Sequence, residues 1–286
     1  MRRPTAIRML GLLLAIGGLW TALTQQPKAP PPPEALTVEK VADNLHIIVG
    51  SGGNVGVLTT SEGVILIDDK FERNVPQILE KVKSITSQPI KYIVNTHQHG
   101  DHTGGNHLLM TSVEIFAHQN AKNNMMKQSL PGVPRIAFRD ELTLTLGGKE
   151  VRARHFGAGH TNGDAVIYFP QQRVVHTGDL FVRGAPFIDY DSGGASDPWM
   201  KTLDGIMSLD ADTFIPGHGA LSKKSDVAEF KKKFETMRGR VRDLVTQGKK
   251  RDEIPTLLKL DDLGWQISGL FAKGLPSLYD EMARSR

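Results

Sequence analysis

Short apolar runs bounded by glycine and proline alternate with longer segments of helical periodicity along this chain. Runs at residues 55–60 and 64–68 are rich in β-branched residues and flanked by glycine, which predicts a β-hairpin. Apolar residues at helical spacing predict a helix over residues 75–85 that ends before Pro89. A buried strand is predicted directly after it, at residues 90–94.

The rest of the chain continues this mixture of hairpins and helices. Further strands are predicted at residues 114–117, 142–146, 150–155, 165–169, 173–177 and 213–215. Helices are predicted after residue 117, over residues 198–209, and in the C-terminal part of the chain. Strands in hairpins with helices between them, rather than regular strand–helix–strand repeats, indicate an α+β fold.

The N-terminal 24 residues have the pattern of a secretory signal peptide. Arg2, Arg3 and Arg8 precede a short, glycine-interrupted apolar run, which is too short for a comfortable membrane span. An uncleaved N-terminal anchor is the alternative for residues 1–24. Residues 25–36 form a stiff, proline-rich linker, and residues 37–286 form the folded domain. We therefore expect a periplasmic or secreted protein, or alternatively one anchored to the inner membrane and facing the periplasm.

Charge and composition narrow the possible partners. The formal net charge is +4, and the basic residues are concentrated at residues 223–251, where apolar positions recur at helical spacing. This pattern predicts an amphipathic helix with a solvated basic face, without the interleaved aromatic residues of a nucleic-acid surface. We expect a small-molecule substrate and no nucleic-acid partner; the oligomeric state is not predicted. The chain has no cysteine, so any metal must be held by nitrogen and oxygen ligands.

The stretch NTHQHGDHTGG follows the strand predicted at residues 90–94 and places four metal-ligand side chains within six positions. Backbone alternation puts His97 and His99 on one side of the extended segment. Gly100 permits a sharp turn, so Asp101 and His102 can face a second point in space. One loop can therefore supply ligands to two adjacent metal ions.

Three later stretches also place one ligand side chain beside glycine at the end of a predicted strand. GAGHTNGD contains His160, HTGDLF contains Asp179, and PGHG contains His218. Loops at strand ends are where a rigid scaffold commonly presents its chemistry. The remaining histidines of the domain are interpreted as structural: His46, His107, His118, His155 and His176.

In this order and spacing, the motifs HQHGDH, GHTNGD, HTGDLF and PGHG resemble those of the metallo-β-lactamase superfamily. The resemblance covers about residues 36–221. It implies a four-layer αββα sandwich with the site at one edge of the paired sheets. The run ILIDD is similar to the first motif of the family, which implies that Asp68 supports the metal-binding loop.

The resemblance also implies a complete ligand set. The first metal would be held by His97, His99 and His160, the second by Asp101, His102 and His218, with Asp179 bridging both. His99 stands where the diiron flavoproteins of the superfamily have glutamate, which favours two Zn²⁺ ions; iron and manganese are alternatives. Asp179 stands where the true β-lactamases have cysteine, and in this it is similar to glyoxalase II and tRNase Z.

We therefore expect an exported dinuclear zinc hydrolase. A metal-bridging hydroxide would attack the carbonyl group of an ester, thioester, lactone or amide, including a β-lactam. Asp101 is the catalytic candidate, because a carboxylate beside the nucleophile can orient it or transfer its proton. Two alternatives stay open: a β-lactamase proper, and a mononuclear iron oxygenase similar to persulfide dioxygenase that uses His97, His160 and Asp179.

Other side chains are candidates for supporting the ligands or contacting substrate. Thr161, Asn162 and Asp164 can fix imidazole tautomers, or they can simply form the turn. Arg183 can pair with a substrate carboxylate, or it can be an ordinary surface residue. Three aromatic residues can form an apolar wall for the substrate, or they can simply pack the loop: Phe187, Tyr190 and Trp199. Two segments are candidate covers over the site: residues 51–54 and residues 120–139.

Overall fold

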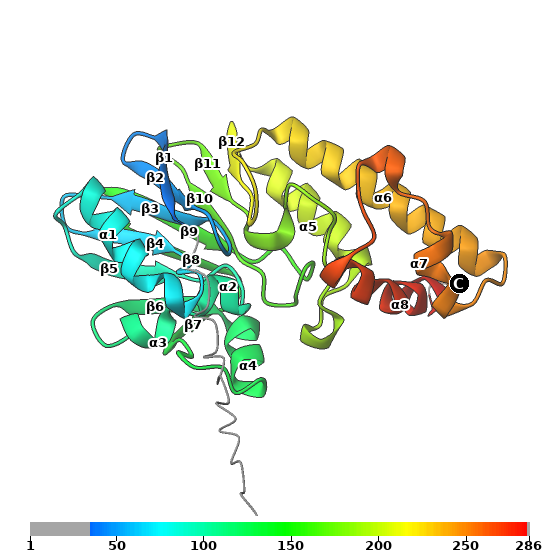
Figure 1. Cartoon of the computed structure of the whole chain (residues 1–286). Helices are drawn as coiled ribbons and strands as arrows, with labels where there is room; N and C mark the ends of the chain where they lie inside the picture. Colours follow the sequence, from blue (N-terminus) through cyan, green and yellow to red (C-terminus); the bar gives the residue numbers. More distant parts are fainter. Residues whose placement is uncertain (1–34, 285–286) are drawn as a thin grey trace, which may run out of the picture. The chain divides into compact units, whose positions relative to one another are not determined.

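The computed structural model describes residues 35–284, which form two facing β-sheets with helices on their outer sides (Figure 1). The predicted signal peptide or anchor, residues 1–24, lies outside the described residues, as does the linker except for its last two positions. Within the described residues, no helix is both long and apolar enough to cross a membrane.

The first sheet has seven strands in the order β1 to β7. They are antiparallel from β1 to β4 and parallel from β4 to β7. Their bounds are β1 Thr37–Ala42, β2 Leu45–Val49, β3 Val55–Thr59, β4 Val64–Ile67, β5 Ile90–Val94, β6 Glu114–His118 and β7 Ile136–Phe138. Since β4 and β5 are parallel, the chain leaves both strands at the same edge of the sheet.

The second sheet has five strands in the order β12-β11-β10-β9-β8. The pair β11–β12 is parallel and the other pairs are antiparallel. Their bounds are β8 Glu141–Leu146, β9 Lys149–Arg154, β10 Val166–Phe169, β11 Val174–His176 and β12 Thr213–Ile215. The parallel pair again brings two strand ends to one edge.

Helices cover the outer face of each sheet. Those beside the first sheet are η1 Glu72–Asn74, α1 Val75–Ile85, α2 Gly100–Thr103, α3 Asn106–Leu109 and α4 Gln119–Lys127. Those that follow are η2 Gly178–Leu180, η3 Tyr190–Ser192, α5 Ser196–Ser208, α6 Lys224–Thr246, η4 Arg251–Glu253, α7 Ile254–Leu257, η5 Asp261–Leu263 and α8 Gly269–Arg284.

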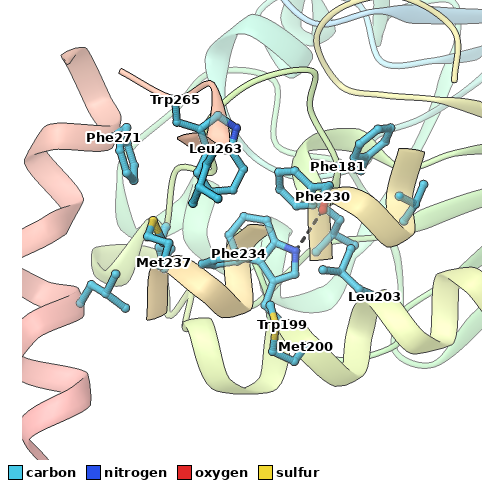
Figure 2. Packing of buried hydrophobic residues seen from close by; sticks show 14 of the residues in the cluster. Phe181, Trp199, Met200, Leu203, Phe230, Phe234, Met237, Leu263, Trp265 and Phe271 are labelled. Atoms are coloured by element: carbon cyan, nitrogen blue, oxygen red, sulfur yellow. Dashed lines mark hydrogen bonds between the residues drawn. The ribbon is translucent and has the colours of Figure 1, made fainter. Parts of the chain in front are cut away.

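Three separate hydrophobic cores hold the layers together. One lies between α1 and the first sheet, one between the two sheets, and one between the second sheet and the helices α5, α6 and α8. In the last core the Trp199 ring packs edge-on against Phe234, with ring centroids 5.0 Å apart (Figure 2). The indole Nε1 of Trp199 donates to the carbonyl of Leu180 at 3.0 Å, which satisfies its buried polar atom. The layer order is therefore αββα, and the predicted α+β sandwich is confirmed.

Most predicted elements are present, with boundaries close to those expected from the pattern. The helix at residues 75–85 and the strands at residues 90–94 and 213–215 have the predicted bounds. The predicted basic helix is α6, which buries Val227, Phe230, Phe234, Met237 and Val241 and leaves Leu244 partly exposed.

Two strands, β1 and β7, were not predicted. β1 is an edge strand without a buried residue, so it lacks the alternation that marks a strand facing a core. Residues 120–139 were suggested as a cover over the site. This was wrong for residues 120–127, which belong to α4, and for residues 136–138, which form β7. The segment begins within α4 and ends just after β7, which pairs with β6 as part of the sheet.

His118 has the structural role assigned to it. It ends β6, accepts a hydrogen bond from the Asn120 backbone N–H at its Nδ1, and stacks on His155 with ring centroids 3.9 Å apart. Burial, followed by the neighbouring His155 ring, lowers the pKa of His118 from 6.5 to about 4. The folded protein therefore prefers His118 neutral.

This preference predicts a pH-dependent stability. Because the folded pKa is depressed, the stabilisation is complete above about pH 6.5 and is lost as the pH falls towards 4. The His118→Asn variant keeps the acceptor for Asn120 but does not titrate. Urea unfolding should show that wild type loses up to about 3 kcal/mol more than this variant between these pH values. Parallel pH profiles for the two proteins would contradict the prediction.

Candidate metal centre

The site lies where strand ends from both sheets meet at one edge of the sandwich. The end of β4 supplies Asp68, and the end of β5 leads into His97 and the following ligands. From the second sheet, η2 after β11 supplies Asp179, and the loop after β12 supplies His218. His160 lies in the loop that precedes β10. The topology thus brings together candidate ligands that are up to 121 positions apart in the chain, from His97 to His218.

The first group of candidate ligands is His97, His99 and His160. The Nδ1 atom of His99 lies 3.2 Å from Nε2 of His97 and 2.9 Å from Nε2 of His160. His97 and His160 are each 1% exposed, whereas His99 faces the cavity above them. The three nitrogen atoms therefore converge on one point, as the sequence predicts for a first metal.

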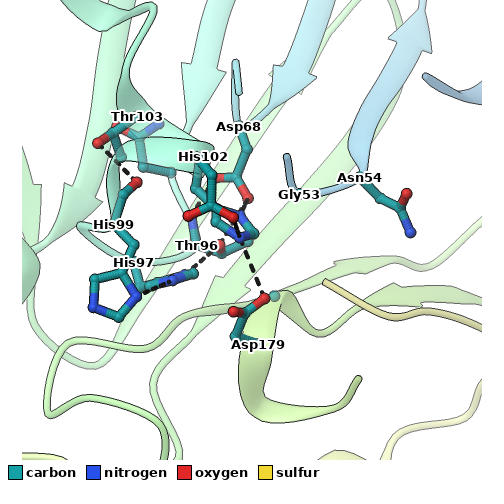
Figure 3. A network of polar contacts seen from close by, with 12 residues as sticks. Gly53, Asn54, Asp68, Thr96, His97, His99, His102, Thr103 and Asp179 are labelled. Atoms are coloured by element: carbon teal, nitrogen blue, oxygen red, sulfur yellow. Dashed lines mark hydrogen bonds and ion pairs between the residues drawn. The ribbon is translucent and has the colours of Figure 1, made fainter. Parts of the chain in front are cut away.

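The second group is Asp101, His102 and His218. Oδ2 of Asp101 lies 3.2 Å from Nε2 of His218 and 3.7 Å from Nε2 of His102. Asp179 lies between the two groups: its Oδ1 is 3.2 Å from His102 Nε2 (Figure 3). Its Oδ2 is 3.7 Å from His160 Nε2. The structure thus brings all seven predicted ligands together, with Asp179 in the bridging position.

Hydrogen bonds around the imidazoles determine which ring nitrogen is free to bind a metal. His102 Nδ1 donates to Asp68 at 2.7 Å, and His160 Nδ1 donates to the carbonyl of Phe187 at 2.6 Å. His99 Nε2 lies 2.8 Å from the Asp189 carboxylate, and donation from this nitrogen leaves Nδ1 as the acceptor of the neutral ring. In each ring the lone pair therefore faces the centre, as metal ligation requires.

Two buried atoms at the centre of this arrangement fit a bound cation. His102 Nε2 and Asp179 Oδ1 are buried and make no hydrogen bond within the described part of the chain. When His102 carries its proton on Nδ1 alone, both atoms are acceptors 3.2 Å apart and require a positive charge between them. A metal ion would supply that charge, as would a second proton on His102: burial would lower the pKa of this ring, but the carboxylates of Asp179 and Asp68 raise it. The donor set contains only imidazole nitrogen and carboxylate oxygen, which suits zinc, iron or manganese.

The pKa values of His160 in the first group and His218 in the second group are shifted in opposite directions. Burial lowers the pKa of His160 to about 4 and keeps it neutral at pH 7. Burial would also lower the pKa of His218, but the carboxylates of Asp101 and Asp179 outweigh it and raise the value to about 9. The carboxylate-rich second group therefore attracts positive charge more strongly than the first.

Asp68 holds the ligand loop in the manner implied by the sequence. It is fully buried with a positive φ of 64°. Its carboxylate accepts hydrogen bonds from the backbone N–H and the hydroxyl of Thr96, both at 2.7 Å, as well as from His102. One carboxylate thus orients an imidazole and the strand end from which the loop departs.

Asp189 is a supporting residue that the sequence analysis missed. Its carboxylate accepts from His99 Nε2 and from the Ser192 backbone N–H, and its own N–H donates to the His160 carbonyl at 2.9 Å. Burial alone would raise the pKa of Asp189, but the hydrogen bonds from His99 and Ser192 outweigh it and lower the value to about 2. No motif marks Asp189, because its role comes only from the fold of the loop around it.

Residues 51–54 do not form the flexible cover suggested by their sequence. Gly53 packs directly on the His102 ring, where a Cβ atom would lie 2.2 Å from the ring carbon Cε1. The side-chain amide of Asn54 donates to the carbonyls of Pro216 and Gly219 at 2.9 and 2.8 Å. This turn is therefore a fixed clamp that joins the His102 loop to the His218 loop.

The other predicted supporting residues have more local roles. Thr161 donates from its N–H and its hydroxyl to the Asp164 carboxylate, and burial raises the pKa of Asp164 to about 7. Asn162 bonds to Asn120 and Asn124 of α4. Neither Asn162 nor Asp164 hydrogen-bonds to any of the seven ligands among the described contacts, so the turn-forming interpretation holds for both.

The three aromatic candidates have different positions. Phe187 lines the cavity over the site and stacks near His99, with ring centroids 6.1 Å apart. Trp199 belongs to the core between α5 and α6, so its suggested place in a substrate wall was wrong. Tyr190 donates its hydroxyl to Glu281 of α8 at 2.6 Å and anchors the loop instead.

A cavity of about 670 Å³ opens over the two ligand groups. Five of the seven candidate ligands reach it: His99, Asp101, His160, Asp179 and His218. Arg183 lies at its side, with Nη1 3.0 Å from Asp226 Oδ1 and with nearly half of its side chain exposed. A substrate group can therefore approach the ligands directly from solvent.

Comparison with known proteins agrees with this geometry. The family model described as Metallo-beta-lactamase superfamily matches residues 48–218. The solved structure titled Metallo-beta-lactamase from Pontibacter korlensis superposes with a TM-score of 0.63 at 22% identity, covering 69% of this chain and 99% of that one. The DIM-1 metallo-beta-lactamase structure gives a TM-score of 0.63 at 21% identity, covering 72% and 98%.

Sequence relatives carry different names. Beta-lactamase-like protein 2 homolog of Caenorhabditis elegans is 27% identical over 77% of this chain and 76% of its own length. Metallo-beta-lactamase type 2 of Bacteroides fragilis is 26% identical over 60% and 70%. The 2,4-dinitroanisole O-demethylase subunit alpha of Nocardioides sp. (strain JS1661) is 27% identical over 68% of this chain, and the match spans 62% of that protein.

The contact between Asp189 and His99 predicts a loss of metal affinity when its charge is removed. Asp189→Asn keeps an acceptor for Ser192 but weakens the carboxylate–imidazole pair, so zinc affinity should fall about tenfold to a hundredfold. Competition with a chromophoric chelator measures this. Asp191→Asn, at an exposed position in the same loop, is the matched control and should bind zinc as wild type does. Equal affinities for both variants would contradict the assigned role.

Proposed function

The chain belongs to the metallo-beta-lactamase superfamily and is a metal-dependent hydrolase, and we propose that it uses two zinc ions to hydrolyse an ester, thioester, lactone or amide. One observation carries the proposal: Asp179 lies between two groups of three ligands, each of which faces its own point. A single ion would use only part of this set. The paired arrangement suits two ions that share one carboxylate.

The donor set also supports zinc. Imidazole and carboxylate both bind zinc, and the chain has no thiolate to offer. Zinc ions held here would lower the pKa of a water molecule and polarise a carbonyl oxygen of the substrate. The tautomers fixed by Asp68, Asp189 and the Phe187 carbonyl keep the ligands preorganised for this chemistry.

Asp101 has the best position for proton transfer. Its carboxylate lines the cavity while contacting His218 at 3.2 Å, so it lies beside both the ligands and the approaching substrate. We assign to it the orientation of the attacking water and the acceptance of a proton from it. Arg183 remains the candidate partner for an anionic substrate group at the cavity side, in competition with Asp226.

A β-lactam is one amide among the proposed substrates. Two solved metallo-β-lactamases share the fold, and several sequence relatives carry that enzyme name. Another relative is named as an O-demethylase subunit, so the names of relatives span more than one substrate class. Asp179, in place of the cysteine expected in true β-lactamases, favours a general carbonyl hydrolase over a dedicated β-lactamase.

We further propose that the enzyme acts outside the cytoplasm, in the periplasm or as a secreted protein. This rests on the sequence pattern of residues 1–24, with retention as an inner-membrane anchor as the alternative. Fractionation of cells expressing the whole chain, with N-terminal sequencing of the product, tests the location. Recovery of full-length protein from the cytoplasm would contradict export.

Substitution of the ligands tests the proposed chemistry. Asp101→Ala and His160→Ala should each reduce turnover to the buffer rate, because each removes a ligand and Asp101 also removes the proton acceptor. The assay is a panel of nitrocefin, a nitrophenyl ester, an acyl thioester and a lactone. His107→Ala is the control, since His107 is a histidine outside the seven-ligand set and should leave turnover unchanged.

The panel also separates the alternatives. Nitrocefin as the preferred substrate would replace the general hydrolase with a β-lactamase. Turnover that survives both Asp101→Ala and His160→Ala would contradict the proposed site. One iron ion per chain, with oxygen uptake on a persulfide substrate and no hydrolysis, would replace the hydrolase with the oxygenase.

A further inference from the structure

Three apolar side chains from separate parts of the chain meet beside the candidate ligands. Phe71 follows β4, Phe187 lies in the loop after η2, and Leu270 lies in the first turn of α8; all three line the same cavity. We call these three residues the apolar wall. Leu270 is 57% exposed, which is unusual for a leucine on a helix that otherwise packs in the core. Part of its surface lines the cavity beside the candidate ligands.

The helix that carries Leu270, α8, is held by apolar packing and by hydrogen bonds to the rest of the domain. Leu275, Leu278 and Met282 of α8 are each 1% exposed and belong to the core shared with α5 and α6. The Glu281 carboxylate accepts from the Tyr190 hydroxyl and from the backbone N–H groups of residues 196 and 197. These contacts hold α8 in place. Leu270 therefore has a defined position relative to Phe71 and Phe187.

The wall is also joined to the machinery that positions the ligands. Tyr190, which bonds to α8, directly follows Asp189, which orients His99. Phe187 presents its ring to the cavity while its carbonyl accepts from His160. A group that rests on the apolar wall is thus held at a fixed position relative to the ligands.

Apart from the candidate ligands, the described lining of the cavity carries little charge. Among the described residues that line it, Arg183 is the single lysine or arginine, and its guanidinium pairs with Asp226 at 3.0 Å. Valine and alanine at positions 182 and 185 add to the apolar lining. A volume of about 670 Å³ lies within the range of sites for drug-sized ligands and exceeds what an acetyl group needs.

We propose that the substrate is a carbonyl compound with an apolar acyl chain that packs on Phe71, Phe187 and Leu270. The proposal rests on the proposed hydrolase function and specifies its substrate class. In hydrolysis of such a thioester, the oxygen of water bonds to the acyl carbon, the carbon–sulfur bond breaks, and a proton goes to the departing thiolate. Leu270, from a helix beyond the family-matched residues 48–218, sets the preference for chain length.

A series of thioesters tests the preference directly. Acetyl, butanoyl, hexanoyl and octanoyl thioesters of N-acetylcysteamine share one polar leaving group and differ only in the acyl chain. Because the chain has no cysteine, a thiol reagent reads the released thiol without background from the protein. For the zinc-loaded whole chain, kcat/KM should rise about threefold per added methylene between butanoyl and octanoyl, as expected for burial of apolar surface.

A matched pair of variants assigns the effect to the wall. Leu270→Asn should reduce the gain to less than about twofold per methylene, so that its deficit relative to wild type grows with chain length. Leu79→Asn, at a leucine that is 43% exposed on α1 and does not line the cavity, is the control and should keep the wild-type slope. A flat wild-type series, or an equal slope in Leu270→Asn, would overturn the proposal.

Binding of the carboxylic-acid products separates this inference from the proposed function. Calorimetric titration with acetate, butanoate, hexanoate and octanoate should show affinity that rises with chain length in wild type and in Leu79→Asn, and less so in Leu270→Asn. If this holds while no thioester is hydrolysed, the apolar wall stands and the proposed carbonyl hydrolysis falls. If thioesters are hydrolysed while neither rate nor affinity depends on chain length, the hydrolase stands and the wall falls.

Discussion

The contact between Asp179 and His102 determines what the rest of the site must be. A carboxylate oxygen and an imidazole nitrogen lie 3.2 Å apart, both buried and both directed at the same space. Asp68 accepts a hydrogen bond from the other ring nitrogen of His102. Burial alone would lower the pKa of His102, but the carboxylates of Asp179 and Asp68 outweigh it and raise the pKa well above its usual value. The buried pair therefore requires positive charge between its members, which either a second proton on His102 or a bound metal ion supplies, and burial strengthens this requirement because water cannot screen the charges.

The fold meets this requirement by collecting strand ends at one edge. Parallel pairing of β4 with β5, and of β11 with β12, delivers ligands from both sheets to the same place. Glycine then permits the close approach: a Cβ atom on Gly217 would lie 1.9 Å from Oδ1 of Asp179. The cores on either side keep these strands rigid, so the ligand positions follow from packing far from the site.

The sequence predicted the ligands better than their supports. Four candidate ligands are close together in the chain: His97, His99, Asp101 and His102. Their residue types and close spacing indicate metal binding even before the conformation of the loop is known. Asp189 and the clamp residue Asn54 act through contacts with residues distant in sequence, 90 positions away for His99 and 162 for Pro216, so no local pattern marks them. The edge strand β1 escaped prediction for a related reason, since its alternation is not imposed by a core. The position of Leu270 beside the cavity could not be predicted from the sequence, because it depends on how α8 packs.

The proposed function requires that the seven convergent side chains hold two metal ions. Native mass spectrometry of the purified protein, loaded with zinc and desalted, measures the number of ions per chain most directly. Two zinc ions per chain in wild type, and fewer in Asp179→Ala, are the result expected from a carboxylate shared by both groups. A wild-type chain that retains one ion or none, or an Asp179→Ala chain that still retains two, would contradict the account.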